Sequence, residues 1–269
     1  MKKLHQIQSR ARQTKLVAQR IAENKAAQEI DLTKWIFERL KILPEDSILE
    51  LGCGTGAQTL KMAETLNDKG RIIAIDIAKE ALDTIASKLE KSQTALVTLL
   101  ESNMDKFGDA LKDHRFNDLQ YDLCFCAYAL YYSSDPEKVL NGLKSRLTET
   151  GRIVIVGPYG SNNKPFFDLL KSCGVVLPDL VTYSSQDFMC DLVLTWAIRN
   201  FKAIQISTVT NRIRWNKSDN VLNYWRGTTF YESEKFPVVE EAINLHFKKY
   251  PEFINEKWIM LTEMTDAHA

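Results

Sequence analysis

Short apolar runs alternate with amphipathic stretches from residue 48 to residue 157. The apolar runs are of strand length and rich in Val, Ile and Leu, whereas the stretches between them repeat at helical spacing. This alternation predicts a doubly wound α/β sheet that is mostly parallel. The predicted strands lie at residues 48–51, 71–75, 95–100, 121–127 and 152–156, and the predicted helices at 58–66, 78–91 and 135–147, with a turn at 150–151.

The regions on either side follow different patterns. Residues 2–28 are basic and carry apolar side chains at mostly helical spacing, and a second helix is expected at about 31–41. Beyond residue 157 the pattern predicts helices, one long β-rich run and a final strand. The helices are expected at about 164–172, 186–198, 218–226 and 236–249, the β-rich run at 201–215 and the last strand at 257–265.

A glycine-rich turn follows the first predicted strand. Gly52, Gly54 and Gly56 alternate along Ile48–Ala57, which lets the backbone bend tightly and approach a ligand. Such a turn at the carboxyl end of a strand is typical of nucleotide-type sites in open α/β sheets. The spacing also satisfies a relaxed dinucleotide fingerprint. Glu50 argues against a dinucleotide there, because a pyrophosphate needs hydrogen-bond donors.

A second acidic residue ends the next predicted strand. Asp76 lies 20 residues after Gly56, the distance at which one βα unit returns an acid to the neighbouring strand end. A carboxylate there can accept hydrogen bonds from both hydroxyls of a ribose. Capping of the following helix is compatible with this role.

The sequence Glu50-x-Gly-x-Gly-x-Gly56 resembles the first motif of class I S-adenosylmethionine (SAM)-dependent methyltransferases. The resemblance implies a Rossmann-like sheet of seven mostly parallel strands, with helices on both faces and a helical insertion between the last two strands. It divides the chain into a helical lid at 1–43, a SAM-binding domain at 44–215, a substrate-side insertion at 216–255 and a last strand at 256–269.

The same resemblance implies which residues bind SAM and the product S-adenosylhomocysteine. The acid of the first motif helps to organise the methionine end of the cofactor. The acid at the end of the second strand binds the ribose, and the turn after the third strand contacts the adenine. The expected cofactor residues are Glu50, Gly52, Cys53, Gly54, Gly56, Asp76, Ile77, Asn103, Met104 and Cys126.

Candidate residues for the methyl acceptor follow the fourth strand and lie in the C-terminal aromatic region. We expect Tyr128, Tyr132, Trp225 and Tyr231 to contact the substrate. Tyr131 is the preferred catalytic candidate by position. His246 is a second candidate as a general base, although a histidine on an apolar helix face is more often structural.

Composition narrows the function further. The 35 basic and 35 acidic residues balance, so charge does not favour nucleic acid or an anionic membrane as a partner. Five cysteines without ligand spacing indicate neither disulfides nor zinc, and no apolar run is long enough to cross a bilayer. Cys126 and Ala127, at the fourth strand end, offer no oxygen ligands for a hard cation. We therefore expect a cytoplasmic protein without a metal, either a monomer or a homodimer.

These observations predict a SAM-dependent methyltransferase that modifies a small molecule, on oxygen or nitrogen in preference to carbon. Because the donor is already activated, in-line alignment in an aromatic-lined pocket can carry the catalysis. One alternative is an RNA or protein methyltransferase that uses the basic N-terminal helix. Others are a non-catalytic partner subunit with the SAM fold and a nicotinamide-dependent oxidoreductase.

Overall fold

The computed structural model describes residues 14–89, 96–114 and 116–268 of the chain. Contacts divide these residues into two compact units. The sheet unit comprises Thr33–Gly157, Met189–Ser207 and the described residues from Met260 onward; the helical unit comprises the described residues up to Leu32, Pro158–Phe188 and Thr208–Ile259. These boundaries differ from the linear division expected from the sequence. Residues 158–188 and 208–215, assigned there to the cofactor domain, group with the insertion at 216–255 instead.

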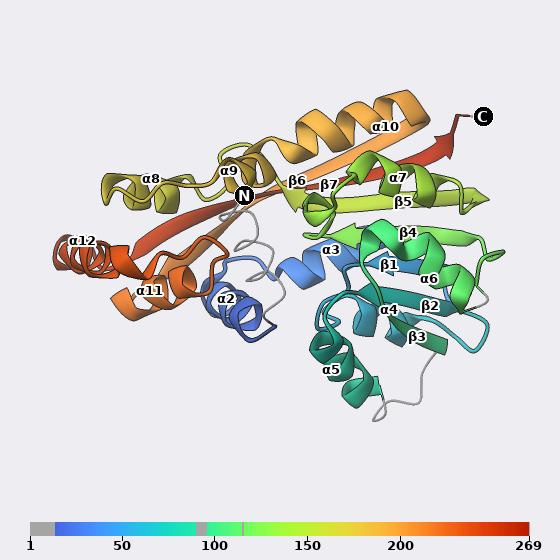
Figure 1. Cartoon of the computed structure of the whole chain (residues 1–269), viewed down its shortest axis with the longest axis horizontal. Coiled ribbons are helices and arrows are strands. Elements are labelled where there is room, and N and C mark those ends of the chain that lie inside the picture. The colour runs from blue at the N-terminus through green and yellow to red at the C-terminus, as the bar shows by residue number, and fades with distance from the viewer. Residues whose placement is uncertain (1–13, 90–95, 115, 269) are drawn as a thin grey trace. The chain divides into compact units, whose positions relative to one another are not determined.

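The described strands form a seven-stranded sheet in the order β3-β2-β1-β4-β5-β7-β6. The pairs among the first five strands in this order are parallel, and their succession can be followed in Figure 1. One strand of the sheet is antiparallel to the others. Helices lie on both faces of the sheet. The strands are β1 (Ser47–Leu51), β2 (Arg71–Asp76), β3 (Leu96–Glu101), β4 (Tyr121–Ala127), β5 (Leu147–Pro158), β6 (Phe201–Trp215) and β7 (Phe253–Ala267).

The predicted fold class is confirmed, but two strands are longer than expected. β7 begins at Phe253 and β5 begins at Leu147. The turn predicted at 150–151 lies within β5, where the pairing with β4 shifts register between Leu147 and Arg152. The glycine at 151 serves a close approach of two strands. A Cβ there would lie 2.7 Å from the carbonyl oxygen of Tyr121 on β4, so Gly151 lets β5 pass β4 within the sheet.

The helices of the sheet unit connect successive strands. Helix α7 illustrates how the sequence defines them: Pro136 occupies its first turn, and the Asp135 side chain accepts a hydrogen bond from the Lys138 amide at 3.1 Å. The described helices of this unit are α3 (Leu32–Leu40), α4 (Thr59–Thr65), α5 (Lys79–Leu89), α6 (Phe107–Asp113), α7 (Pro136–Lys144) and α10 (Thr195–Asn200), with short 3₁₀ turns at Met104–Lys106 and Leu130–Tyr132.

The helix predicted at 186–198 forms at 188–200 but is not a uniform α-helix. It contains a π-helical segment (Met189–Leu194) followed by α10, and a separate helix, α9 (Asp179–Gln186), precedes it. The π-helical segment begins at Met189, whose side chain lies against β5: a Cβ at Gly157 would come within 2.7 Å of the Met189 sulfur. Periodicity alone does not register this change of helical type, because all three segments carry apolar residues at near-helical spacing.

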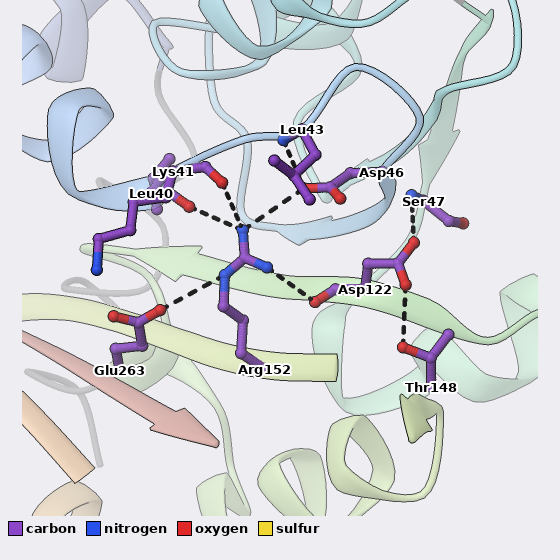
Figure 2. Close-up of polar contacts among 9 residues, drawn as sticks. All are labelled: Leu40, Lys41, Leu43, Asp46, Ser47, Asp122, Thr148, Arg152 and Glu263. Carbon is purple, nitrogen blue, oxygen red and sulfur yellow. Dashed lines mark hydrogen bonds and ion pairs between the residues drawn. The ribbon is translucent and has the colours of Figure 1, made fainter. Parts of the chain in front are cut away.

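A buried arginine joins the amino ends of several strands. The Arg152 side chain on β5 is 13% exposed, and its guanidinium donates to the Leu40 carbonyl at 2.8 Å. It also lies 3.5 Å from carboxylate oxygens of Asp46 and Glu263 (Figure 2). Asp122, whose carbonyl oxygen also contacts this guanidinium, extends the network through its own carboxylate to the ends of β1 and β5. This network fixes the edge of the sheet opposite the carboxyl ends of the parallel strands.

The helical unit has its own aromatic core. Helices α8 (Lys164–Ser172), α9, α11 (Ser218–Arg226) and α12 (Phe236–Lys249) surround buried side chains from both β6 and β7. Helix α2 (Thr14–Ala27) packs against α11 in the same unit. The Glu23 carbonyl of α2 accepts a hydrogen bond from the Trp215 indole at 3.2 Å, and its carboxylate accepts one from Asn220 at 3.0 Å.

Candidate active site

The glycine turn lies at the carboxyl end of β1, where the sequence predicts it. All three glycines have positive φ angles, 72° at Gly52 and 52° at Gly54 among them. A Cβ on Gly52 would lie 2.2 Å from the Cβ of Ala129, whereas a Cβ on Gly54 would meet nothing within 4 Å. Gly52 therefore lets the loop after β4 pack onto the turn, and the space beside Gly54 is open to a ligand.

Glu50 is a buried carboxyl group within this turn. Its side chain is 3% exposed and accepts a hydrogen bond from the Thr59 hydroxyl at 2.6 Å. Burial raises the pKa of Glu50 to about 7; the Thr59 hydrogen bond opposes this rise and the charge of Asp76 adds to it. Among the described residues Glu50 has no basic partner. A buried carboxyl group in this state fits a cationic ligand such as the ammonium of the SAM methionine.

Asp76 is held rigidly at the end of β2. One carboxylate oxygen accepts a hydrogen bond from the Gly54 amide at 2.8 Å, and the other accepts one from the Ala78 amide at 2.8 Å. The carboxylate therefore closes a turn just before the following helix and ties that turn to the glycine turn. Each oxygen keeps a further lone pair, so both can still accept a ribose hydroxyl.

The loops after β3 and β4 are joined by an aspartate that sequence reasoning missed. Asp105 accepts hydrogen bonds from the Ser133 hydroxyl at 2.5 Å, from the Ser134 hydroxyl at 2.6 Å and from the Ser134 amide at 3.1 Å. Burial opposes ionisation of Asp105, but these bonds and the charge of Lys138 lower its pKa overall. We call this set of contacts the Asp105 clamp. In the sequence the clamp is visible only as a serine pair before Asp135-Pro136. This pair does not indicate that its partner, Asp105, lies 28 residues before Ser133.

The clamp positions the residues expected near the adenine. The Asn103 side chain accepts a hydrogen bond from the Asp105 amide at 3.0 Å, so it caps the 3₁₀ turn that begins at Met104. The Met104 methyl group lies 3.8 Å from the position of a Cβ on Gly52. Asn103, Met104 and the glycine turn are therefore brought together, as the resemblance implies. Ile77, on the neighbouring β2 end, is 40% exposed.

The end of β4 carries the tyrosine candidates. Tyr128 has a φ of 56°, which is uncommon for a residue with a side chain, and burial raises the pKa of its phenol. Backbone strain of this kind is concentrated at functional sites. Tyr131 and Tyr132 follow in a 3₁₀ turn with their rings 4.7 Å apart. Cys126 is fully buried in the strand, and burial raises its pKa to about 12.

Other candidate residues have roles in packing. Burial raises the pKa of Cys53 far above its ordinary range, so this thiol stays protonated. His246, in the helical unit, contacts the Glu252 carbonyl through Nε2 at 2.9 Å, and its ring packs on Tyr250 and Phe253. These contacts favour the structural interpretation that the sequence left open. In the same unit Trp225 is fully buried and packs against Tyr231, so its role toward a substrate stays a prediction.

Two further features concern the described residues only. No group of three His, Cys, Asp or Glu side chains there is arranged to hold a metal ion. Within the same residues no helix combines the length and apolar character that a membrane crossing requires. The requirement for a metal stays a matter for experiment.

Three comparisons with known proteins agree with this geometry. The model of a family described as "Methyltransferase domain" matches residues 42–187. A demethylmenaquinone methyltransferase of Lactobacillus johnsonii is 28% identical over 123 residues, which cover 46% of this chain and 48% of that protein. A ubiquinone/menaquinone biosynthesis C-methyltransferase of Vibrio vulnificus is 27% identical over 128 residues, 47% of this chain and 45% of its own. The chain thus spans about half the length of the curated relatives it matches.

Solved structures show the same fold at low sequence identity. The YcgJ protein of Bacillus subtilis matches with a TM-score of 0.58 and 13% identity, over 88% of this chain and 98% of that one. A putative methyltransferase of Bacillus halodurans also has a TM-score of 0.58, with 10% identity over 89% of this chain and all of the other.

Fold and family now agree on the class of protein. The strand order, glycine turn and two acidic strand residues define a class I SAM-dependent methyltransferase fold. Because its methyltransferase domain covers more than half of the residues, the chain belongs to this family. The family that the resemblance names is thereby confirmed, and SAM is the cofactor that this family supports.

Proposed function

We propose that this protein transfers the methyl group of SAM to a small-molecule acceptor. The observation that carries the proposal is the pair of carboxyl groups at the glycine turn, with Glu50 buried and Asp76 fixed by two backbone amides. The ammonium of the cofactor compensates the first, and the ribose hydroxyls donate to the second. SAM then supplies the activated methyl group, and the residues of the chain align it with the acceptor.

The relatives favour carbon as the acceptor atom. Four of them are named C-methyltransferases: three belong to ubiquinone/menaquinone biosynthesis and one is a probable cobalt-precorrin enzyme. The expectation of oxygen or nitrogen in preference to carbon therefore finds no support. We propose a ring carbon of a small conjugated molecule as the acceptor, with Tyr128, Tyr131 and Tyr132 at the end of β4 as the residues that meet it.

The alternative of a nucleic-acid arm loses support for the described part of the N-terminal region. Helix α2 is hydrogen-bonded through Glu23 to Trp215 and Asn220, so it is a packed element of the helical unit. The more N-terminal part of the predicted arm and lid, residues 1–13, lies outside the described residues. A lid function for the N-terminal helices stays a prediction.

The fold by itself does not specify methyl transfer. The [4+2]-cyclase SpnF matches with a TM-score of 0.52 and 13% identity, over 88% of this chain and 81% of its own. Activity must therefore be tested separately from cofactor binding. Calorimetric titration with S-adenosylhomocysteine should give one-site binding, and titration with NAD should give no heat. Absence of S-adenosylhomocysteine binding would refute the proposal.

A transfer assay distinguishes the remaining possibilities. The protein is incubated with methyl-tritiated SAM and, in separate reactions, with a demethylated naphthoquinone, with RNA and with a protein mixture. We expect label in the organic extract of the quinone reaction and none in the macromolecular fractions. The Asp76→Ala variant serves as the control for cofactor-dependent labelling. Label in RNA or protein would show that the acceptor belongs to that class of macromolecule. Cofactor binding without label in any fraction would indicate a non-catalytic protein.

A further inference from the structure

A second polar cluster lies within the helical unit, on the part of β7 that faces the aromatic core. The Lys257 ammonium donates to the Asn163 side-chain oxygen at 2.5 Å and to the Tyr224 hydroxyl at 2.5 Å. It also lies 4.5 Å from the centre of the Tyr224 ring. Asn255, which is fully buried, donates its amide group to the same Asn163 oxygen at 2.9 Å. One amide oxygen thus receives hydrogen bonds from two strand residues.

Within the described part of the chain, this lysine has no acidic partner. Its contacts among the described residues are to an amide oxygen, a hydroxyl and an aromatic ring, and none is to a carboxylate. Burial lowers the pKa of Lys257, Tyr224 opposes that effect, and the positive charge of Arg20 on α2 lowers it further. An ammonium that is packed among aromatic rings without a counterion is costly, and a bound anion would remove that cost.

Two hydrogen-bonding positions in the cluster are unused by the described residues. The Lys257 ammonium has three N–H groups, of which the Asn163 and Tyr224 bonds use two. The side-chain oxygen of Asn255 is buried and has no hydrogen-bond partner. Lys257 as a whole residue is partly buried, whereas Asn255 is fully buried. The cluster therefore offers one charged donor and one unfilled acceptor, on two residues that share the Asn163 oxygen.

We propose that Lys257, Tyr224 and Asn255 form a binding site for the oxyanion, a carboxylate or a phosphate, of a small molecule. The ammonium binds the oxyanion, and a hydroxyl or amine of the same ligand fills the Asn255 oxygen. The Tyr224 ring packs against Trp215 in a tilted arrangement, with ring centres 4.9 Å apart, and edge-on against Phe166, with ring centres 5.1 Å apart. These rings exclude water from one side of the cluster, which strengthens the attraction between ammonium and anion. The inference does not depend on methyl transfer.

The first test measures anion binding to the full-length chain. Inorganic phosphate and benzoate are titrated separately by calorimetry at constant ionic strength. Phosphate tests for a phosphate ligand, and benzoate tests for a carboxylate ligand. We expect one-site binding of at least one probe, weakened ten-fold or more by Lys257→Met and restored by Lys257→Arg. The control variant Lys249→Met removes an exposed positive charge from α12 in the same unit and should bind as the unmodified protein does.

The second test places the missing carboxylate inside the protein. Asn163→Asp is nearly isosteric, and its carboxylate would receive the hydrogen bonds that the Asn163 oxygen receives now. Residue 163 has a φ of 60°, which aspartate tolerates about as well as asparagine. We expect this variant to unfold at a higher temperature and to lose anion binding, because its own carboxylate pairs with Lys257.

Specific results would overturn the proposal. Failure of the unmodified protein to bind either probe would do so, as would equal affinities of the Lys257→Met variant and the Lys249→Met control. If Lys257→Met does not fold, the Asn163→Asp variant decides: unchanged anion affinity in that variant rejects the site. Because the titrations require no SAM, their failure is distinguishable from failure of the proposed methyl transfer.

Discussion

Replacement of Glu50 by glutamine should reveal how much stability the cofactor site costs. The Glu50 carboxyl group is 3% exposed and has one hydrogen bond, from Thr59, and no basic partner among the described residues. Glutamine keeps the shape of the side chain and an oxygen that accepts the Thr59 hydroxyl. The substitution therefore removes the buried charge and leaves the packing almost unchanged.

The magnitude follows from the raised pKa. Burial moves the pKa of Glu50 from 4.5 in an exposed carboxyl to about 7 in the folded protein. The folded state thus binds a proton more tightly than the unfolded state, so this contribution to stability is present below pH 4.5. It is lost as the pH rises through 7, because the folded protein must then hold a buried carboxylate. A rise from 4.5 to about 7 corresponds to about 3 kcal/mol at full titration.

The assay is urea unfolding without cofactor at pH 5 and pH 8.5. The free energy of unfolding of Glu50→Gln, relative to the unmodified protein, should increase by about 2–3 kcal/mol between these two pH values. Glu64→Gln, at an exposed position on α4, is the matched control and should show no such increase. Parallel pH profiles for Glu50→Gln and the unmodified protein would refute the reasoning. The same variant should bind S-adenosylhomocysteine more weakly, which would show stability being given up for cofactor binding.

Four further predictions concern the same unit. Asp76→Ala should weaken S-adenosylhomocysteine binding ten- to a hundred-fold, since a charge-assisted hydrogen bond contributes about 1.5–3 kcal/mol; unchanged calorimetric affinity would place the ribose elsewhere. Gly52→Ala should destabilise the fold by about 2–4 kcal/mol in urea unfolding, because its Cβ would lie 2.2 Å from that of Ala129 at a positive φ. Asp105→Asn should reduce cofactor affinity several-fold in the same titration, whereas Asp109→Asn, an exposed neighbour, should not. Methyl transfer should persist in excess chelator; activity that is lost and then restored by magnesium would contradict this.

Much of the fold could be predicted from the sequence because periodicity reports burial. The strands β4 and β6 and the helices α8, α11 and α12 begin and end where apolar spacing places them. The glycine turn could be predicted because its conformation is local: only residues without a Cβ fit the positive φ angles and the close approach of Ala129 at Gly52. The position of Asp76 at the next strand end could be predicted because one βα unit has a nearly constant length.

The remaining features depend on partners that lie far apart in the chain. Asp105 meets Ser133 and Ser134 only because the parallel order of the sheet brings two loops to the same edge. The glycine at 151 reads as a turn in sequence, yet it serves a strand contact that exists only once β4 and β5 are paired. No local pattern contains either partner.

Electrostatic character was also decided by the tertiary structure. Glu50 is an ordinary acid in the sequence, and burial beside Asp76 makes it a group that titrates near pH 7. Lys257 is only the first residue of the expected last strand in the sequence, and the fold places it against Asn163 and Tyr224, with no carboxylate partner among the described residues. Sequence determines which side chains are available and which local conformations they favour. A pKa or a missing counterion depends on what surrounds the charge in three dimensions, which only the packed chain defines.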